Sequence, residues 1–233
     1  MRIQPRNPTI YLFDIDGTLI TSGGTGRGAM LEAFEQVLDM PSVKLSFSFG
    51  GMTDRAIVRQ GLTELDVPVD ESRIDALLAL YLERLECTAL PGRGFREHVG
   101  VRPILDSLVG SPNVALGIGT GNVEKGARIK LRCVDLDHYF RFGGFGCDAE
   151  ARHRLLSRGA DRGAGQLGLP REQCRIVVIG DTPRDIEAAH AIGADCIAVA
   201  TGGAASAELA SHNPEWLFDD LTAPGVVQAL LGD

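Results

Sequence analysis

Two carboxylates interrupt an apolar run near the start of the chain. The stretch YLFDIDGTLI places Asp14 and Asp16 two residues apart, after residues that are typical of a buried strand. Burying a carboxylate costs free energy unless the group has a partner. Because a core strand rarely ends in two unpaired acids for packing reasons, the pair indicates a site that performs chemistry.

Polar side chains follow two further apolar runs, NVALGIG and RIVVIG. These residues are Thr120, Gly121 and Asn122 after the first run, and Asp181, Thr182 and Asp185 after the second. Ligands of open α/β sheets bind beyond the carboxyl ends of the strands, so we expect these groups to converge. Two carboxylates about 4 Å apart repel by roughly 4 kcal/mol at an effective dielectric constant near 20. Three carboxylates predict a cation, and all-oxygen donors favour Mg²⁺.

Several of these polar residues also fit purely structural roles, which stay open at this level. Thr18 and Thr120 could each be the N-cap of a following helix. The run from Thr182 to Asp185 also fits a helix start, with a threonine N-cap, Pro183 at the first helical position and an acid that completes a capping box.

Short apolar runs alternate with helical patterns along most of the chain. The expected strands are 9–15, 113–119, 175–180, 196–200 and, more weakly, 215–218, and the expected helices lie at 121–134, 149–167 and 184–192. Continuous apolar runs suit strands that are buried on both faces of a parallel sheet. The alternation therefore predicts an α/β fold with a doubly wound parallel sheet.

The segment between the first two strands breaks this alternation. It carries two helical patterns, around Met30–Leu38 and Ile74–Leu85, with Asp70 as the expected N-cap of the second. VKLSFSFG (43–50) fits either a short strand or a loop. We therefore expect an α/β core domain at 1–22 and 91–233 and an inserted helical cap at 23–90. The glycine-rich flanks TSGGTGRG and LPGRG are either ordinary turns or hinges that close the cap over the site.

Composition narrows the possible partners. The 233 residues carry a net charge of −8 and include five cysteines with no CxxC pair, so we expect neither a basic nucleic-acid surface nor a zinc or disulfide framework. No apolar run approaches membrane-spanning length, and the first residues do not resemble a signal peptide. We therefore expect a cytoplasmic protein with no nucleic acid or membrane partner; the sequence does not indicate an oligomeric state.

The motifs resemble the signatures of the haloacid dehalogenase-like (HAD) superfamily. FDIDGTL resembles the first signature, VALGIGTGN is similar to the second, and IVVIGDTPRDIEAAHAIGA is similar to the fourth, in the family's order. The helical insertion and FGGMTDRAI resemble the phosphoglycolate-phosphatase-like branch. The third signature usually supplies a lysine, but GGFGCDAEARHRLL resembles a version with arginine. The best register selects Arg152, with Arg154 next and Lys125 if the register differs.

The resemblance implies an Mg²⁺-dependent phosphatase that acts on a small phosphorylated metabolite, of the phosphoglycolate or sugar-phosphate type. Asp14 would be the nucleophile and Asp16 the acid and base. The implied metal ligands are Asp14, the backbone carbonyl of Asp16, and Asp181, while Asp185 would bind the metal or the waters of the metal. The implied phosphoryl-binding groups are Thr120, Gly121, Asn122 and Arg152. The cap candidates for substrate contact are Thr53, Asp54, Arg55, Arg59 and Arg27.

Other functions remain as alternatives. A phosphomutase of the β-phosphoglucomutase kind would keep the same acids, and nothing in the sequence separates it from a phosphatase. A receiver-like signalling domain also uses a phospho-accepting aspartate, but it is shorter and needs a lysine after a late strand, and no lysine follows Lys130. The dehalogenase and phosphonatase branches lack an acid like Asp16, and the second uses a cap lysine, for which only Lys44 is present.

Overall fold

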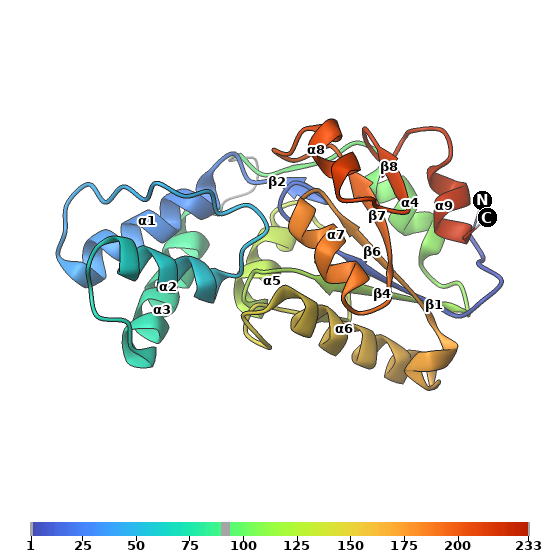
Figure 1. The fold of residues 1–233 in the computed structure, drawn as a ribbon, viewed down its shortest axis with the longest axis horizontal. Helices are drawn as coiled ribbons and strands as arrows, with labels where there is room; N and C mark the ends of the chain where they lie inside the picture. The colour runs from blue at the N-terminus through green and yellow to red at the C-terminus, as the bar shows by residue number, and fades with distance from the viewer. Residues whose placement is uncertain (1, 90–93, 233) are drawn as a thin grey trace.

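A parallel six-stranded sheet with strand order β5-β4-β1-β6-β7-β8 forms the centre of the molecule (Figure 1). The structure is a computed structural model, and it describes residues 2–89 and 94–232. The strands are β1 (Thr9–Phe13), β4 (Val114–Gly119), β5 (Phe142–Gly144), β6 (Arg175–Gly180), β7 (Asp195–Val199) and β8 (Trp216–Phe218). This sheet, with the helical insertion described below, confirms the predicted fold class.

Helices cover both faces of the sheet because the strands are apolar on both sides. Along β1, Ile10 and Leu12 pack in one buried cluster and Tyr11 and Phe13 in another. The first cluster includes residues of α6 (Arg152–Leu167), α7 (Pro183–His190) and α8 (Ser206–Ser211). The second includes residues of α4 (Val101–Leu108), α5 (Glu124–Arg132) and α9 (Val226–Leu231). Two 3₁₀ turns, Asp137–Tyr139 and Arg171–Gln173, complete the α/β body.

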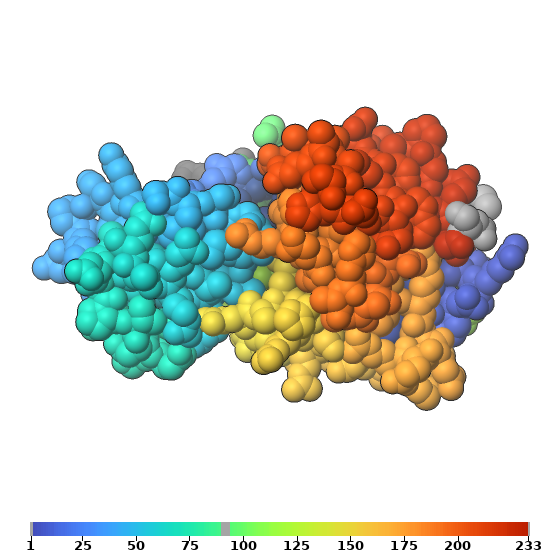
Figure 2. All heavy atoms as spheres, viewed as in Figure 1, coloured from blue at the N-terminus to red at the C-terminus, as the bar shows by residue number. Residues whose placement is uncertain are grey.

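The helical insertion consists of α1 (Thr25–Leu38), α2 (Asp54–Glu64) and α3 (Glu71–Thr88) and lies at one end of the sheet (Figure 1). Asp70 is the N-cap of α3, as predicted, and accepts a hydrogen bond from the Arg73 N–H at 2.8 Å. Residues 43–50 form a loop rather than a strand. In Figure 2 the atoms of the insertion and of the α/β body touch along their boundary.

The two connections to the insertion pair with each other. β2 (Ile20–Thr21) and β3 (Arg96–Glu97) form a short antiparallel ladder that the sequence patterns did not predict. Gly23 and Gly94 from the two predicted hinges come close together there, because a Cβ built on Gly23 would lie 3.1 Å from the Gly94 Cα. The rest of the second hinge, 90–93, and the predicted domain limit at 90/91 lie outside the described residues, and both domain limits stay predictions.

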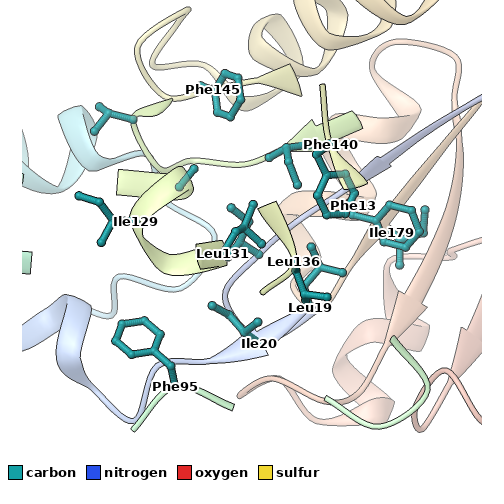
Figure 3. Packing of buried hydrophobic residues seen from close by; sticks show 14 of the residues in the cluster. Phe13, Leu19, Ile20, Phe95, Ile129, Leu131, Leu136, Phe140, Phe145 and Ile179 are labelled. Carbon is teal, nitrogen blue, oxygen red and sulfur yellow. The ribbon is translucent and has the colours of Figure 1, made fainter. Parts of the chain in front are cut away.

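A large apolar cluster joins the sheet to α5 and to the connections (Figure 3). It includes Phe13 and Ile179 from the sheet, Ile129 and Leu131 from α5, and Ile20 from β2. This packing fixes α5 beside the carboxyl ends of the central strands. Within the described residues, no helix combines the length and the apolar character needed to cross a membrane.

Candidate active site

The register of the sheet brings three polar strand ends together. Phe13 at the end of β1 pairs with Ile118 of β4 on one side and with Ile179 of β6 on the other. Asp14 therefore lies beside the residues that immediately precede Thr120 and Asp181. Thr120 and Asp181 are both buried, as is Asp14.

An acidic cluster forms where α7 begins next to these strand ends. Carboxylate oxygens of Asp14, Asp181 and Asp185 all lie within 4.8 Å of one another, and these three residues are 5%, 4% and 0% exposed. The Thr18 hydroxyl donates to Asp181 Oδ1 at 3.0 Å, so Thr18 supports the cluster. Asp185 Oδ2 accepts from the N–H and the hydroxyl of Thr182, at 3.0 and 2.6 Å. The expected capping box is therefore present, and the same aspartate belongs to the acidic cluster.

Arg152, the first residue of α6, is the cation in contact with this cluster. Its Nε donates to Asp185 Oδ1 at 2.8 Å, and its Nη2 lies 3.0 Å from Asp14 Oδ2. Nη2 is buried and makes no hydrogen bond of good geometry with the described residues. The other two candidates for this position lie elsewhere: Arg154 is exposed, and Lys125, with its side chain 60% exposed, pairs with Glu86.

The acidic cluster carries more negative charge than Arg152 can neutralise. Burial raises the pKa of Asp14 to about 6, and the Arg152 guanidinium opposes this shift. Burial and the charges of Asp185 and Asp14 raise the pKa of Asp181 well above its ordinary value. Burial alone would lower the pKa of Arg152, but Asp185 and Asp14 hold it above its usual range. Oxygen donors with excess negative charge are suited to hold a hard divalent cation.

A second group of contacts surrounds Asp16. Asn122 Nδ2 donates to Asp16 Oδ2 at 2.8 Å and to Thr120 Oγ1 at 2.9 Å. Lys130 Nζ lies 2.6 Å from Asp16 Oδ2 and 2.7 Å from Asn122 Oδ1. Lys130 is 5% exposed. The motifs in the sequence do not point to Lys130, although its position between the apolar Ile129 and Leu131 is a signal that this turn of α5 is buried.

A cavity of about 200 Å³ separates the strand ends from the insertion. Asp14, Asp16, Thr120, Gly121, Asn122, Lys130, Arg152 and Asp181 line its α/β side. Arg27, Met30, Asp54, Ile57 and Tyr81 are among the residues that line its opposite side. Most of the site residues that we predicted from the sequence therefore line one cavity, and Lys130 and Tyr81, which we did not predict, line it as well.

Three of the cap candidates do not line this cavity. The Thr53 hydroxyl caps α2 by accepting from the Ala56 N–H at 3.2 Å. Arg55 pairs with Glu71 and with Asp75 on α3, and Arg59 pairs with Glu71 and Glu150. Helix capping and ion pairs between neighbouring helices account for these side chains, and the predicted substrate contacts of Thr53 and Arg55 have no support in this geometry.

Arg27 is the cap arginine that does line the cavity. Its guanidinium donates to the carbonyls of Leu45 and Phe47 at 2.9 and 3.3 Å and lies 4.2 Å from the centroid of the Phe49 ring. Because these partners are uncharged, they hold the side chain in place without neutralising it.

Asp54 joins the insertion to the loop after β4. Its N–H donates to the Gly121 carbonyl at 2.9 Å, and its Oδ2 accepts from the Val123 N–H at 2.8 Å. A Cβ on Gly121 would lie 2.1 Å from the Met52 carbonyl oxygen, so this close approach requires glycine. Burial raises the pKa of Asp54 to about 6, although the charge of Lys130 opposes the shift. Asp54 therefore combines a docking contact with a place in the cavity wall.

The chain is similar to known hydrolases and phosphatases in sequence. The HAD-hydrolase-like family model matches residues 156–224. A phosphoglycolate phosphatase of Pseudomonas syringae pv. tomato is 25% identical over 222 residues, which cover 92% of this chain and 77% of the relative.

Two solved structures show the same fold at lower identity. One is described as a predicted phosphoglycolate phosphatase from Haemophilus somnus 129pt, with a TM-score of 0.69, 19% identity and coverage of 96% of this chain and 98% of that one. The other is a hydrolase from Pseudomonas syringae, with a TM-score of 0.68, 21% identity and coverage of 92% and 94%.

Proposed function

We propose that the chain, which is similar to haloacid dehalogenase-like hydrolases in sequence and fold, is a member of that superfamily and an Mg²⁺-dependent phosphatase of a small phosphorylated metabolite. One observation supports the proposal: the buried cluster of Asp14, Asp181 and Asp185 lies at a cavity that Asp14, Asp181 and Arg152 line. Arg152 Nη2 is in ion-pair contact with Asp14 and Asp185 but makes no hydrogen bond of good geometry with the described residues. Acids that can hold a cation, next to a guanidinium that can bind an anion, are the requirements of phosphoryl transfer.

The donor set fits Mg²⁺ because it consists of oxygen atoms with uncompensated negative charge. Asp14, Asp181 and the backbone carbonyl of Asp16 would hold the ion, and Asp185 would bind the ion or its waters. When bound, the ion would neutralise charge on these carboxylates and on the phosphoryl group.

Asp14 would perform nucleophilic catalysis. Its carboxylate oxygen attacks the phosphorus, the bond from phosphorus to the ester oxygen breaks, and an aspartyl-phosphate forms. Asp16 donates a proton to the departing ester oxygen, so the leaving group departs as an alcohol. Asp16 then takes a proton from the water that attacks the aspartyl-phosphate, which releases phosphate and restores Asp14.

Thr120 and Arg152 would bind the phosphoryl oxygens that do not react. The Thr120 hydroxyl oxygen accepts hydrogen bonds from Asn122, so its own hydrogen can be donated to Asp14 or to a phosphoryl oxygen. Arg152 Nη2 supplies a charged N–H beside the nucleophile, and donors to phosphate of this kind are among the stronger hydrogen-bonding groups in proteins. The backbone N–H groups of Gly121 and Asn122 are further candidates from the same loop.

The cavity favours a small substrate with an acidic or polar group. Its volume of about 200 Å³ suits a metabolite rather than a polymer. Arg27 carries a charge that its carbonyl partners leave uncompensated, so it could pair with a carboxylate of the substrate. Phosphoglycolate, the substrate in the name of the Pseudomonas syringae relative, has such a carboxylate, and a sugar phosphate is the second substrate class that we propose.

Phosphate release from a panel of phosphomonoesters tests the proposal. The wild type should release phosphate in the presence of Mg²⁺ and lose this activity with EDTA, and Asp14→Asn should be inactive in both conditions. Asp135→Asn is the matched control, because the Asp135 side chain is 88% exposed and asparagine tolerates its left-handed backbone. Isomerisation of a sugar phosphate without net phosphate release would contradict a phosphatase and indicate a mutase.

A further inference from the structure

We propose that Lys130 is a positioning residue, which holds the carboxylate of Asp16 in the orientation from which it transfers a proton to the leaving oxygen. The inference rests on the proposed phosphatase function. Lys130 touches neither Asp14 nor the acidic cluster in any contact of the described residues, so its role differs from that of Arg152.

The contacts of Asp16 all end on one of its two oxygens. Lys130 Nζ and Asn122 Nδ2 both donate to Oδ2, at 2.6 and 2.8 Å. Among the described residues no hydrogen bond ends on Oδ1, and the Asp16 side chain is 38% exposed and lines the cavity. Two donors on Oδ2 fix the plane of the carboxyl group, so Oδ1 is the oxygen left to face a substrate.

The ammonium group of Lys130 is itself held in place, because Lys130 lies in a buried turn of α5 and also binds Asn122. Ile129 and Leu131 are buried in the cluster of Figure 3, so three consecutive residues of α5 are enclosed. The ammonium also donates to Asn122 Oδ1 at 2.7 Å, which orients the amide that binds Asp16. A lysine side chain is flexible in water, and this enclosure restricts it to one position.

Charge makes this arrangement necessary for Asp16. Asp14 and Asp54 also line the cavity, and both are buried carboxylates. Their charges would repel Asp16 toward solvent if nothing held it. Arg152 is paired with Asp14 and Asp185, and Arg27 is bound to backbone carbonyls. Among the described residues, this leaves Lys130 as the cavity cation that contacts Asp16.

The helical insertion approaches the same ammonium group. A Cβ on Gly26, in the first turn of α1, would lie 3.2 Å from Lys130 Nζ and 3.4 Å from its Cε. A methyl group there would push the ammonium group by a few tenths of an ångström. Gly28 lies two residues further along the same helix, and a Cβ there would meet no atom of the described residues within 4 Å.

The test compares two esters that differ in their need for a proton. The leaving group of an alkyl phosphate is a strongly basic alkoxide unless it is protonated, whereas the leaving group of p-nitrophenyl phosphate is the stable p-nitrophenolate anion. For Lys130→Met we expect kcat/KM to fall about 10²- to 10³-fold for the alkyl phosphate but less than about tenfold for p-nitrophenyl phosphate, as expected for impaired general acid catalysis. Damage to the fold would lower both values equally.

Three controls sharpen the comparison. Lys125→Met makes the same change on the exposed side of α5 and should leave both esters unaffected. In an Asp16→Asn background, Lys130→Met should cause little further loss, because the two residues act through one carboxylate. Gly26→Ala should reproduce the selective loss to a smaller degree and Gly28→Ala should not, which keeps the test decisive if Lys130→Met fails to fold.

Equal losses for the two esters, or a further large loss in the Asp16→Asn background, would overturn the role of Lys130 and leave the phosphatase proposal intact. A wild type that hydrolyses no ester with Mg²⁺ present would instead contradict the proposed function itself, and the role of Lys130 would fall with it.

Discussion

Asp54→Asn should stabilise the protein at neutral pH, because it removes a buried charge and can keep the side-chain contact with the Val123 N–H. Burial raises the pKa of Asp54 from 3.8 to about 6. At 1.36 kcal/mol per pKa unit, the ionised carboxylate destabilises the folded state by about 3 kcal/mol. Asparagine has the same shape, carries no charge, and keeps an oxygen that can accept from the Val123 N–H.

The effect has a defined pH dependence. The folded state binds the Asp54 proton more tightly than the unfolded chain does, so the free energy of unfolding falls as pH rises from about 4 to about 6 and then levels off. The advantage of Asp54→Asn should therefore be about 1 kcal/mol at pH 4.5 and about 3 kcal/mol at pH 7.5. For a chain of this size, about 3 kcal/mol corresponds to an increase in Tm of roughly 6–12 °C.

Thermal unfolding at pH 4.5 and 7.5 measures this difference on either side of the isoelectric point near 5.2. Asp75→Asn is the matched control in the same insertion, because its carboxylate is 68% exposed and, among the described residues, makes only a surface ion pair with Arg55. A Tm for Asp54→Asn that falls at pH 7.5, or that shifts equally at the two pH values, would refute the reasoning about the buried charge.

Three further perturbations test the site and its closure. In denaturant titrations with EDTA, Arg152→Met should lower the free energy of unfolding by about 3–5 kcal/mol, because it leaves buried acids unpaired. Arg154→Met, at an exposed position, should change the free energy of unfolding by less than about 0.5 kcal/mol. Mg²⁺ at 100 times its Kd should stabilise the wild type by about 2.7 kcal/mol in the same assay, and Asp181→Asn should lose most of this gain. Gly121→Ala should lower kcat/KM at least tenfold, because its methyl group collides with the cap loop. Gly203→Ala should not, because the added Cβ would have no atom of the described residues within 4 Å.

Much of the site could be predicted because parallel strands fix where polar residues meet. Asp14, Thr120 and Asp181 directly follow continuous apolar runs, and the strand register then brings them together. Arg152 followed from a resemblance to a family signature, since a helix charge in isolation looks like any surface arginine. The structure adds that Arg152 is buried against Asp14 and Asp185.

The cap contacts could not be predicted, because they depend on which side of α2 faces the cavity. Thr53, Asp54 and Arg55 are consecutive, yet only Asp54 lines the cavity, while Thr53 caps the helix and Arg55 pairs with α3. A one-residue rotation of a helix is about 100°. Sequence spacing without the packing of α2 against α3 does not set that rotation.

The role of Lys130 could not be predicted from the sequence, because a lysine in the last turn of a helix is usually solvated and favourable there. Only the burial of the whole turn, from Ile129 to Leu131, reveals its role. The missed strand β5 has a different cause: it has three residues, two of them glycine, and carries no strand pattern of its own. It forms because Phe142 to Gly144 pair with Gly117 to Gly119 of β4.

The most direct test of the central claim is to identify the residue that becomes phosphorylated. The wild type, mixed with Mg²⁺ and a small phosphate ester and quenched in acid, should carry one hydroxylamine-sensitive phosphoryl group, which peptide mass spectrometry should locate on Asp14. Asp14→Asn should carry none. Phosphate release by a wild type that never acquires this group, or a phosphoryl group on another residue, would contradict the account.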